Sequence, residues 1–471
     1  MKKFITITLI AIAGTTAAYF YLQRSSLIAK KTIIYAKLPP IPYLDNQPKT
    51  LARRILDADA AIQNEAKPTK HLIELTRLYH ANGYLLESLH CYQALAALQP
   101  ENPRWPHLQA LILAGYGRLN EAIPLFQKSV ELDPSYTPSS IRLGNSFLKQ
   151  NKFDEAETAY RLALSVEASN PHALMGIGRC RIARKDYESA RIPLETAFKA
   201  SQNKIGGDLL VTVYQKLGLS SQAFIAERQA GVGAYSDLPD PWLLDLYSDC
   251  YDAYQVATAG GQAAFGGKAR TGYDLVLRAA KLDPRNAYYQ FQLGNLSSSD
   301  PQRAESHFKK CVELDPDFSD GWTSLHNLYS KTGNPAAADA VLKSGFKHNP
   351  DSPALLILMA KKAKEENQLQ QAASFLQKSA RLRPNEGAAY IEMAQIYFSL
   401  NQIDQGMDMM RSALKAEPGH PLPLSTLALH AITSDSEREA RDLLKQVENH
   451  PRIPQPQVAE LQKKFAAQFG N

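Results

Sequence analysis

Apolar, small and polar positions along this chain repeat with a period of 34 residues. Prolines recur at one phase of the period, and successive ones within each run are 34 residues apart: Pro100 and Pro134, then Pro316, Pro350, Pro384 and Pro418. Because proline cannot continue the hydrogen-bond ladder of a helix, a proline at a fixed phase indicates that one helix ends there before the next unit begins. The pattern therefore predicts an array of repeated helical units.

Within each period, small residues recur at the eighth, twentieth and twenty-seventh positions, and bulky residues at the seventh and twenty-fourth. The clearest examples are Gly144, Gly178 and Gly294 at the eighth position, Ala122, Ala156, Ala190, Ala304, Ala338, Ala372 and Ala440 at the twentieth, Ala163, Ala197 and Ala413 at the twenty-seventh, and Tyr92, Phe126, Tyr160 and Phe308 at the twenty-fourth. Small residues allow two antiparallel helices to approach closely, and bulky residues fill the gaps between them. Each unit is therefore predicted to be a pair of antiparallel helices.

This spacing resembles that of the tetratricopeptide repeat family, whose signature places Leu-Gly, Tyr, Ala, Phe, Ala and Pro at these phases. The resemblance covers most of the chain. It implies an all-α, right-handed superhelical solenoid with a concave groove lined by the first helix of each unit. In this family that groove binds partner proteins or peptides.

The repeat predicts the domain organisation as well. Units 1–5 are expected over 69–237, units 7–11 over 287–454, and capping helices over 49–68 and 455–471, which makes about eleven units in all. Residues 238–286 depart furthest from the period and are expected to form an interrupted sixth unit with a flexible, glycine-rich insertion. The insertion is predicted to bind partners, as insertions in solenoids often do, through Gly260, Gly261, Phe265, Gly266 and Gly267.

The amino terminus predicts a signal anchor over residues 1–23. Lys2 and Lys3 precede an uncharged, proline-free stretch over 4–22, which as a helix is about 28 Å long, close to the thickness of a bilayer's hydrocarbon core. The expected location is a bacterial cytoplasmic membrane, crossed once, with the repeats in the periplasm. A cleaved signal peptide, giving a periplasmic or secreted protein, is the alternative. Four prolines within 24–48 predict an extended tether.

Composition and motifs argue against several classes of function. Lys and Arg number 53 and Asp and Glu 47, with the two signs interspersed, so no nucleic-acid partner is expected. The four cysteines are far apart and form no metal-binding motif, and neither a metal nor a cofactor is predicted. Because no catalytic signature occurs and helix pairs account for nearly the whole chain, the protein is predicted not to be an enzyme.

The predicted groove surface of the first four units contains no acidic residue. Its candidate partner-binding residues are Lys70, Arg77, His80, Arg104, His107, Asn145, Lys149, His172 and Arg179. Such a surface favours an anionic ligand, either an acidic peptide or a chain's carboxyl-terminal tail. Elsewhere, Asp245, Asp249 and Asp252 are spaced to share one face of a helix, which is expected to be solvated; attraction of a cation or a basic partner segment is the alternative.

The favoured function is a scaffold for protein–protein interaction. Two alternatives remain open at this point. One is an assembly or biogenesis factor that holds client tails, as anchored repeat proteins of cytochrome maturation do. The other is a secreted repeat protein of a polysaccharide or adhesion system.

Overall fold

The computed structural model describes residues 24–201, 204–231, 238–448, 450 and 452–470, and the regular structure in these ranges is entirely helical. The predicted signal anchor over residues 1–23 lies outside the described residues. Within them, no helix combines the length and the apolar character needed to cross a membrane. The chain divides into two compact units, Met1–Ala223 with Gly233–Leu282, and Phe224–Val232 with Asp283–Asn471.

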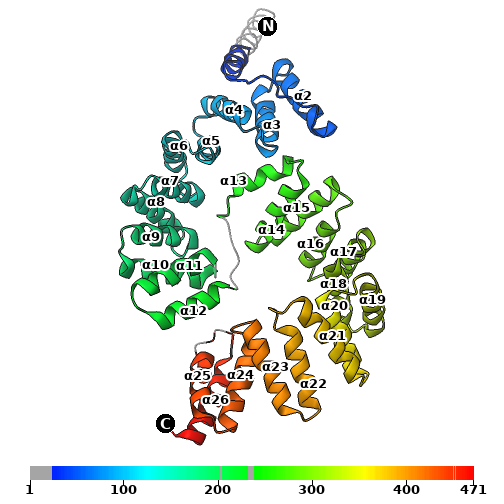
Figure 1. Cartoon of the computed structure of the whole chain (residues 1–471). Helices are drawn as coiled ribbons and strands as arrows, with labels where there is room; N and C mark the ends of the chain where they lie inside the picture. The colour runs from blue at the N-terminus through cyan, green and yellow to red at the C-terminus, as the bar shows by residue number, and fades with distance from the viewer. Residues whose placement is uncertain (1–23, 202–203, 232–237, 449, 451, 471) are drawn as a thin grey trace, which may run out of the picture. The chain divides into compact units, whose positions relative to one another are not determined.

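Four helix pairs and two further helices, α11 and α12, precede the inserted segment (Figure 1). After a capping helix, α2 (Lys49–Asn64), the pairs are α3 (Pro68–Ala81) with α4 (Leu85–Leu98), α5 (Arg104–Gly115) with α6 (Leu119–Leu132), α7 (Thr137–Lys149) with α8 (Phe153–Val166), and α9 (Pro171–Ala183) with α10 (Tyr187–Ser201). The two helices that follow are α11 (Lys204–Lys216), which packs on α9 and α10, and α12 (Ser220–Gly231).

Six further pairs follow the inserted segment, of which the first belongs to the first compact unit and the others to the second. They are α14 (Ala253–Phe265) with α15 (Ala269–Leu282), α16 (Ala287–Leu296) with α17 (Pro301–Leu314), α18 (Ser319–Lys331) with α19 (Pro335–His348), α20 (Pro353–Glu365) with α21 (Leu369–Leu382), α22 (Ala388–Ser399) with α23 (Ile403–Ala416), and α24 (Pro421–Thr433) with α25 (Glu437–Glu448); a last helix, α26 (Gln455–Phe469), packs on α24 and α25.

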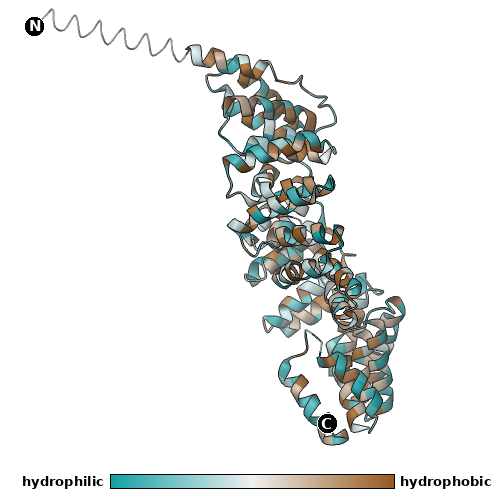
Figure 2. Ribbon diagram, turned by 90° about the vertical axis from the view of Figure 1, so that its left-hand side faces the viewer, coloured by the Kyte–Doolittle hydropathy of each residue, from teal (hydrophilic) through white to brown (hydrophobic). Residues whose placement is uncertain are grey.

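The first helices of neighbouring units contact one another: α5 contacts α7, α7 contacts α9, and α9 contacts α11. These first helices therefore line the inner side of the array, where the resemblance placed the groove. Figure 2 shows hydrophilic and hydrophobic residues interspersed along the helices. The core of units 2–4 is built from the predicted small and bulky positions, including Ala122, Phe126, Ala156 and Tyr160, all fully buried.

The turn inside the helix pairs repeats one backbone feature. The fifteenth residue of nine of the described units has a positive φ: Gly83, Gly117, Asn151, Lys185, Gly267, Gly333, Asn367, Asn401 and Asp435. Glycine adopts this left-handed conformation without steric cost, and Asn and Asp tolerate it better than most residues do. A glycine at this phase, such as Gly267, is thus the ordinary end of a first helix.

The predicted glycine-rich insertion loop is wrong. Residues 253–286 form a regular 34-residue unit, in which Gly260 and Gly261 lie inside α14 and Phe265 is its last residue. A Cβ on Gly260 would lie 2.8 Å from Val276 Cγ2 and 2.9 Å from the carbonyl oxygen of Gly272. The glycines are therefore the small packing positions of a close helix pair, and Gly266 and Gly267 form its turn.

The true insertion comes earlier in the chain, before this pair. Its described part comprises α13 (Pro241–Leu244), the 3₁₀ helix η1 (Asp245–Asp249) and a short extended connection to α14. Asp240 caps α13 through the backbone N–H of Leu243, with Pro241 in the first turn, as expected of an Asp-Pro helix start. The predicted tether also differs, because residues 24–35 are helical and Ile34 is fully buried.

Candidate functional site: an acidic segment on an arginine surface

The inserted segment lies against the amino-terminal helices of its own compact unit. Helix α13 contacts α5, and η1 contacts both α3 and α14 (Figure 1). The segment thus covers the inner face of the first two helix pairs, where four of the predicted groove residues lie. Its contacts fall into a buried end around Asp240 and a more exposed end around Asp245 and Asp249.

At the buried end, the carboxylate of Asp240 is enclosed by donors. Its Oδ2 lies 2.8 Å from His107 Nε2, and its Oδ1 accepts hydrogen bonds from the Tyr136 hydroxyl at 2.6 Å and the Leu243 backbone N–H at 3.2 Å. The other ring nitrogen of His107, Nδ1, lies 2.8 Å from Ser139 Oγ. The Asp240 and His107 side chains are 2% and 0% exposed, so this contact is shielded from solvent.

The electrostatics of Asp240 follow from these contacts. Burial alone would raise the pKa of the Asp240 carboxyl, but the hydrogen bonds and charge of His107, with those from Tyr136 and Leu243, lower it to about 2. The carboxylate is therefore charged at neutral pH. Trp242 adds apolar contact, since its ring stacks on that of Tyr136 with centroids 3.5 Å apart and planes 7° apart.

Ser139, His107 and Asp240 have the contact order of a nucleophile–base–acid triad. A catalytic serine must reach a substrate, however, and Ser139 is fully buried with its Oγ also 2.9 Å from Ser129 Oγ. The arrangement therefore fixes the inserted segment on α5 and α7 and offers no access for chemistry.

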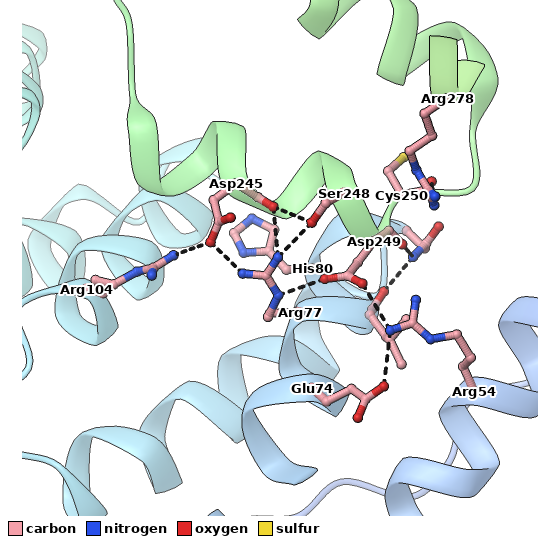
Figure 3. A network of polar contacts seen from close by, with 12 residues as sticks. Arg54, Glu74, Arg77, His80, Arg104, Asp245, Ser248, Asp249, Cys250 and Arg278 are labelled. Atoms are coloured by element: carbon pink, nitrogen blue, oxygen red, sulfur yellow. Dashed lines mark hydrogen bonds and ion pairs between the residues drawn. The ribbon is translucent and has the colours of Figure 1, made fainter. Parts of the chain in front are cut away.

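At the more exposed end, three arginines from α2, α3 and α5 bind two aspartates of η1 (Figure 3). Arg77 donates from Nη1 to Asp245 Oδ2 at 2.6 Å and from Nε to Asp249 Oδ2 at 2.7 Å. Arg104 reaches the same Asp245 oxygen at 2.9 Å, and Arg54 reaches Asp249 Oδ1 at 3.1 Å. We call Arg54, Arg77 and Arg104 the arginine cluster.

The backbone of the segment is bound too. Asn82 donates to the carbonyl oxygen of Asp249 at 2.9 Å and accepts from the N–H of Tyr251 at 2.8 Å. Arg77 donates to the carbonyl oxygen of Asp245 at 2.8 Å, and Arg278 donates to that of Cys250 at 2.7 Å. Because these hydrogen bonds are made to backbone groups, they depend on the path of the segment's backbone more than on the identity of its side chains.

The positive charge on the groove side comes from the arginines, and Glu74 of α3 also accepts a hydrogen bond from Arg54 at 3.1 Å (Figure 3). Burial lowers the pKa of His80 to about 4, against a small opposing effect of Asp240, so this imidazole is neutral at neutral pH. Its Nδ1 lies 3.0 Å from the Tyr92 hydroxyl. The pKa of the Asp245 carboxyl, which partial burial alone would raise, is lowered by hydrogen bonds from Arg104 and Arg77.

The structure divides the nine predicted groove residues into two groups. Arg77, His80, Arg104 and His107 lie at the inserted segment, and three of them bind its carboxylates directly. The others lie outside these contacts: Lys70, Lys149 and Arg179 are exposed, His172 is half-buried, and Asn145 accepts a hydrogen bond from the Tyr160 hydroxyl.

The sequence predicted that the three aspartates share one solvated helical face. This is wrong for Asp245 and Asp249, which bind arginines, and Asp252 does not share their helix. That residue caps α14 through the backbone N–H of Gln255, whereas Asp245 and Asp249 share η1. Sequence reasoning also missed Arg54, Asn82 and Tyr136. The i, i+4 spacing of two aspartates beside an acid-free surface was the available signal, but no repeat pattern pairs residues about 170 positions apart.

Comparisons with known proteins now decide the family. Tetratricopeptide repeat models match residues 141–204, 295–362 and 363–429. The chain is a tetratricopeptide-repeat protein. As such it is similar to cellulose synthase operon protein C of Xanthomonas axonopodis pv. citri, with 23% identity over 77% of this chain, and to the TPR repeat-containing protein YpiA of Bacillus subtilis, with 22% identity over 71%.

These similarities are partial. The tetratricopeptide-repeat chain spans 21% of the length of the Xanthomonas protein and 69% of the Bacillus protein. Among solved structures, that of yeast Tom70 is matched over 85% of this chain and 96% of the other, with a TM-score of 0.38 and 13% identity.

Proposed function

We propose that this protein is a non-enzymatic scaffold that binds segments of partner proteins on the inner face of its repeats. Proteins with tetratricopeptide repeats generally mediate protein–protein interaction, and the observation that carries the proposal is the acid-free inner face of α5, α7 and α9. On α5 this face binds carboxylates of an inserted segment. On α7 and α9, Lys149 and Arg179 are exposed and suited to an acidic partner.

Paired variants test the scaffold. Full-length protein carrying Lys149→Ala with Arg179→Ala should lose most captured partner protein in affinity capture followed by mass spectrometry, because two charges of the inner face are gone. The matched control is Lys128→Ala with Lys199→Ala, which removes two exposed charges from the outer helices α6 and α10. Equal loss of partner in both variants, or in neither, would contradict docking on this face.

We propose further that residues 4–22 anchor the protein in a bacterial cytoplasmic membrane, with the repeats in the periplasm. The support is the nineteen-residue uncharged stretch behind Lys2 and Lys3. An anchored protein resists carbonate extraction and retains its amino-terminal residues in mass spectrometry. A mature chain beginning near Tyr19 would instead establish cleavage, and a carboxyl-terminal reporter active only in the cytoplasm would reverse the orientation.

One similarity favours a second candidate, a role in polysaccharide assembly. The Xanthomonas relative is named as a product of a cellulose synthase operon. If this chain has a related role, disrupting its gene should reduce surface polysaccharide while leaving overall envelope protein content unchanged. Normal polysaccharide in the disrupted strain would remove this candidate.

A further inference from the structure

We propose that α2, α3 and α5 form a recognition site for internal acidic segments of partner proteins with two carboxylates four residues apart, and that in the free chain residues 245–251 of the same protein occupy it. The proposal deepens the proposed function and rests on it. It names the surface, formed by α2, α3 and α5, and the ligand, a segment with two carboxylates.

The first argument is charge complementarity around the two aspartates. Asp245 and Asp249 are held by five hydrogen bonds from side chains of the arginine cluster, one of which Arg77 donates to the carbonyl oxygen of Asp245. Arg77 contacts both carboxylates, so it forms both bonds only when the two acids are spaced as Asp245 and Asp249 are, four residues apart on the 3₁₀ helix η1. Pairing of guanidinium with carboxylate gives short, directional bonds that a neutral segment does not form.

The second argument concerns the direction of the bound chain. Asn82 binds the carbonyl oxygen of Asp249 on one side of Cys250 and the N–H of Tyr251 on the other. The chain therefore continues through the site in both directions. This geometry favours an internal segment over a terminal carboxylate, which has no following N–H to donate.

The third argument is the difference in burial between the two ends of the inserted segment. At the arginine cluster, the side chains of Asp245 and Asp249 are 49% and 14% exposed, whereas at the other end Asp240 and His107 are almost completely buried. The end at the arginine cluster is therefore open to competition from solvent, salt or another acidic segment, while the end at Asp240 stays attached. Tethering gives the chain's own segment an effective concentration on the order of millimolar, which disfavours weak external ligands.

A peptide in trans tests the proposal without a natural partner. A fluorescent peptide with the sequence of residues 243–252 is titrated, by anisotropy at low salt, into full-length protein carrying Asp245→Asn with Asp249→Asn. Neutralising the internal aspartates weakens the resident ligand but leaves the arginine cluster intact. The variant should bind the peptide at least tenfold more tightly than the unsubstituted protein, and adding Arg77→Ala should abolish the gain.

The matched control is Asp274→Asn with Asp442→Asn, which removes the same charge from exposed positions of α15 and α25. It should bind the peptide no better than the unsubstituted protein. Equal binding by the unsubstituted protein and the double variant would overturn occupation by the chain's own segment. Lack of binding by a folded double variant would overturn the recognition site itself.

Hydrogen exchange of the unsubstituted protein keeps the proposal testable if the variant does not fold. Millimolar peptide should increase exchange at the N–H of Tyr251 several-fold and leave the amides of α8 unchanged. Unaltered protection of Tyr251 at saturating peptide would contradict displacement. Retained capture by the Lys149→Ala with Arg179→Ala variant would contradict the scaffold without affecting the peptide result, so the two proposals fail separately.

Discussion

Residues 238–252 and 253–286 follow one another in the chain, yet only the first stretch departs from the repeat. The second stretch contains the densest glycine and is a regular helix pair, α14 with α15. The first is an acidic, partly helical stretch and is the true insertion. Ion pairs with Arg77 and Arg104 and a hydrogen bond with His107 bind it across α3 and α5. In residues 253–286 the glycines indicate close helix packing, whereas in residues 238–252 buried or paired charges indicate the departure from the repeat.

The largest effect is expected at the buried carboxylate of the insertion. Asp240→Ala removes the partner of the buried His107 Nε2 and one partner of the half-buried Tyr136 hydroxyl, and breaking a buried pair in this way costs about 3 kcal/mol or more. Denaturant unfolding of the full-length protein should show a destabilised amino-terminal array. Asp252→Ala, which removes only a helix cap, should cost about 1 kcal/mol; equal losses would contradict the burial argument.

Acid should weaken the same contact. Because the pKa of Asp240 is lowered from 3.8 to about 2 in the folded state, its stabilisation is complete above pH 4 and is lost as pH falls from about 4 to 2. We compare the unfolding free energies of the unsubstituted protein and Asp240→Asn across this range. Their difference should shrink by about 2 kcal/mol as pH falls, and a difference that is constant with pH would contradict a charged, paired Asp240.

Alanine substitution at two neighbouring glycines of α14 should change the stability of the protein in opposite directions. Gly260→Ala places a methyl group 2.8 Å from Val276 Cγ2 and should lower stability by about 1 kcal/mol. At Gly261 nothing lies within 4 Å of the added methyl, so alanine should raise stability by about 0.5–1 kcal/mol through its better helix propensity. Thermal unfolding measures both changes in stability. Equal changes at the two positions would contradict close helix packing at Gly260 and favour the flexible loop that the sequence predicted.

Sequence reasoning reached the helix pairs because their packing is local and periodic. The same small residue recurs wherever two helices approach, so Ala122 and Ala156 could be assigned from spacing alone. Applied to 253–286, that spacing also accounts for Gly260 and Gly272, the eighth and twentieth residues of a unit that begins at 253. The acid-free inner face was likewise visible from spacing, since it follows from which helix positions point inward.

The segment that covers the inner face, residues 238–252, could not be predicted from this spacing. Pairing Asp240 with His107 joins residues 133 positions apart through a single, unrepeated segment, and no periodic signal carries such a contact. Arg54 lies on the capping helix, outside the repeat grid altogether. Only the course of the folded chain brings these groups together.

The smallest effect is expected at the exposed end of the insertion. Arg104→Ala removes one of two arginine contacts to Asp245, whose side chain is 49% exposed. Solvent screens a pair this exposed, so the loss should be about 0.5 kcal/mol at low salt. The loss should fall toward zero in about 0.5 M NaCl, where charges are screened within a few ångströms, while the cost of Asp240→Ala should persist. A salt-independent effect of Arg104→Ala, as large as that of Asp240→Ala, would show that the insertion is locked along its whole length and that its two ends are equivalent.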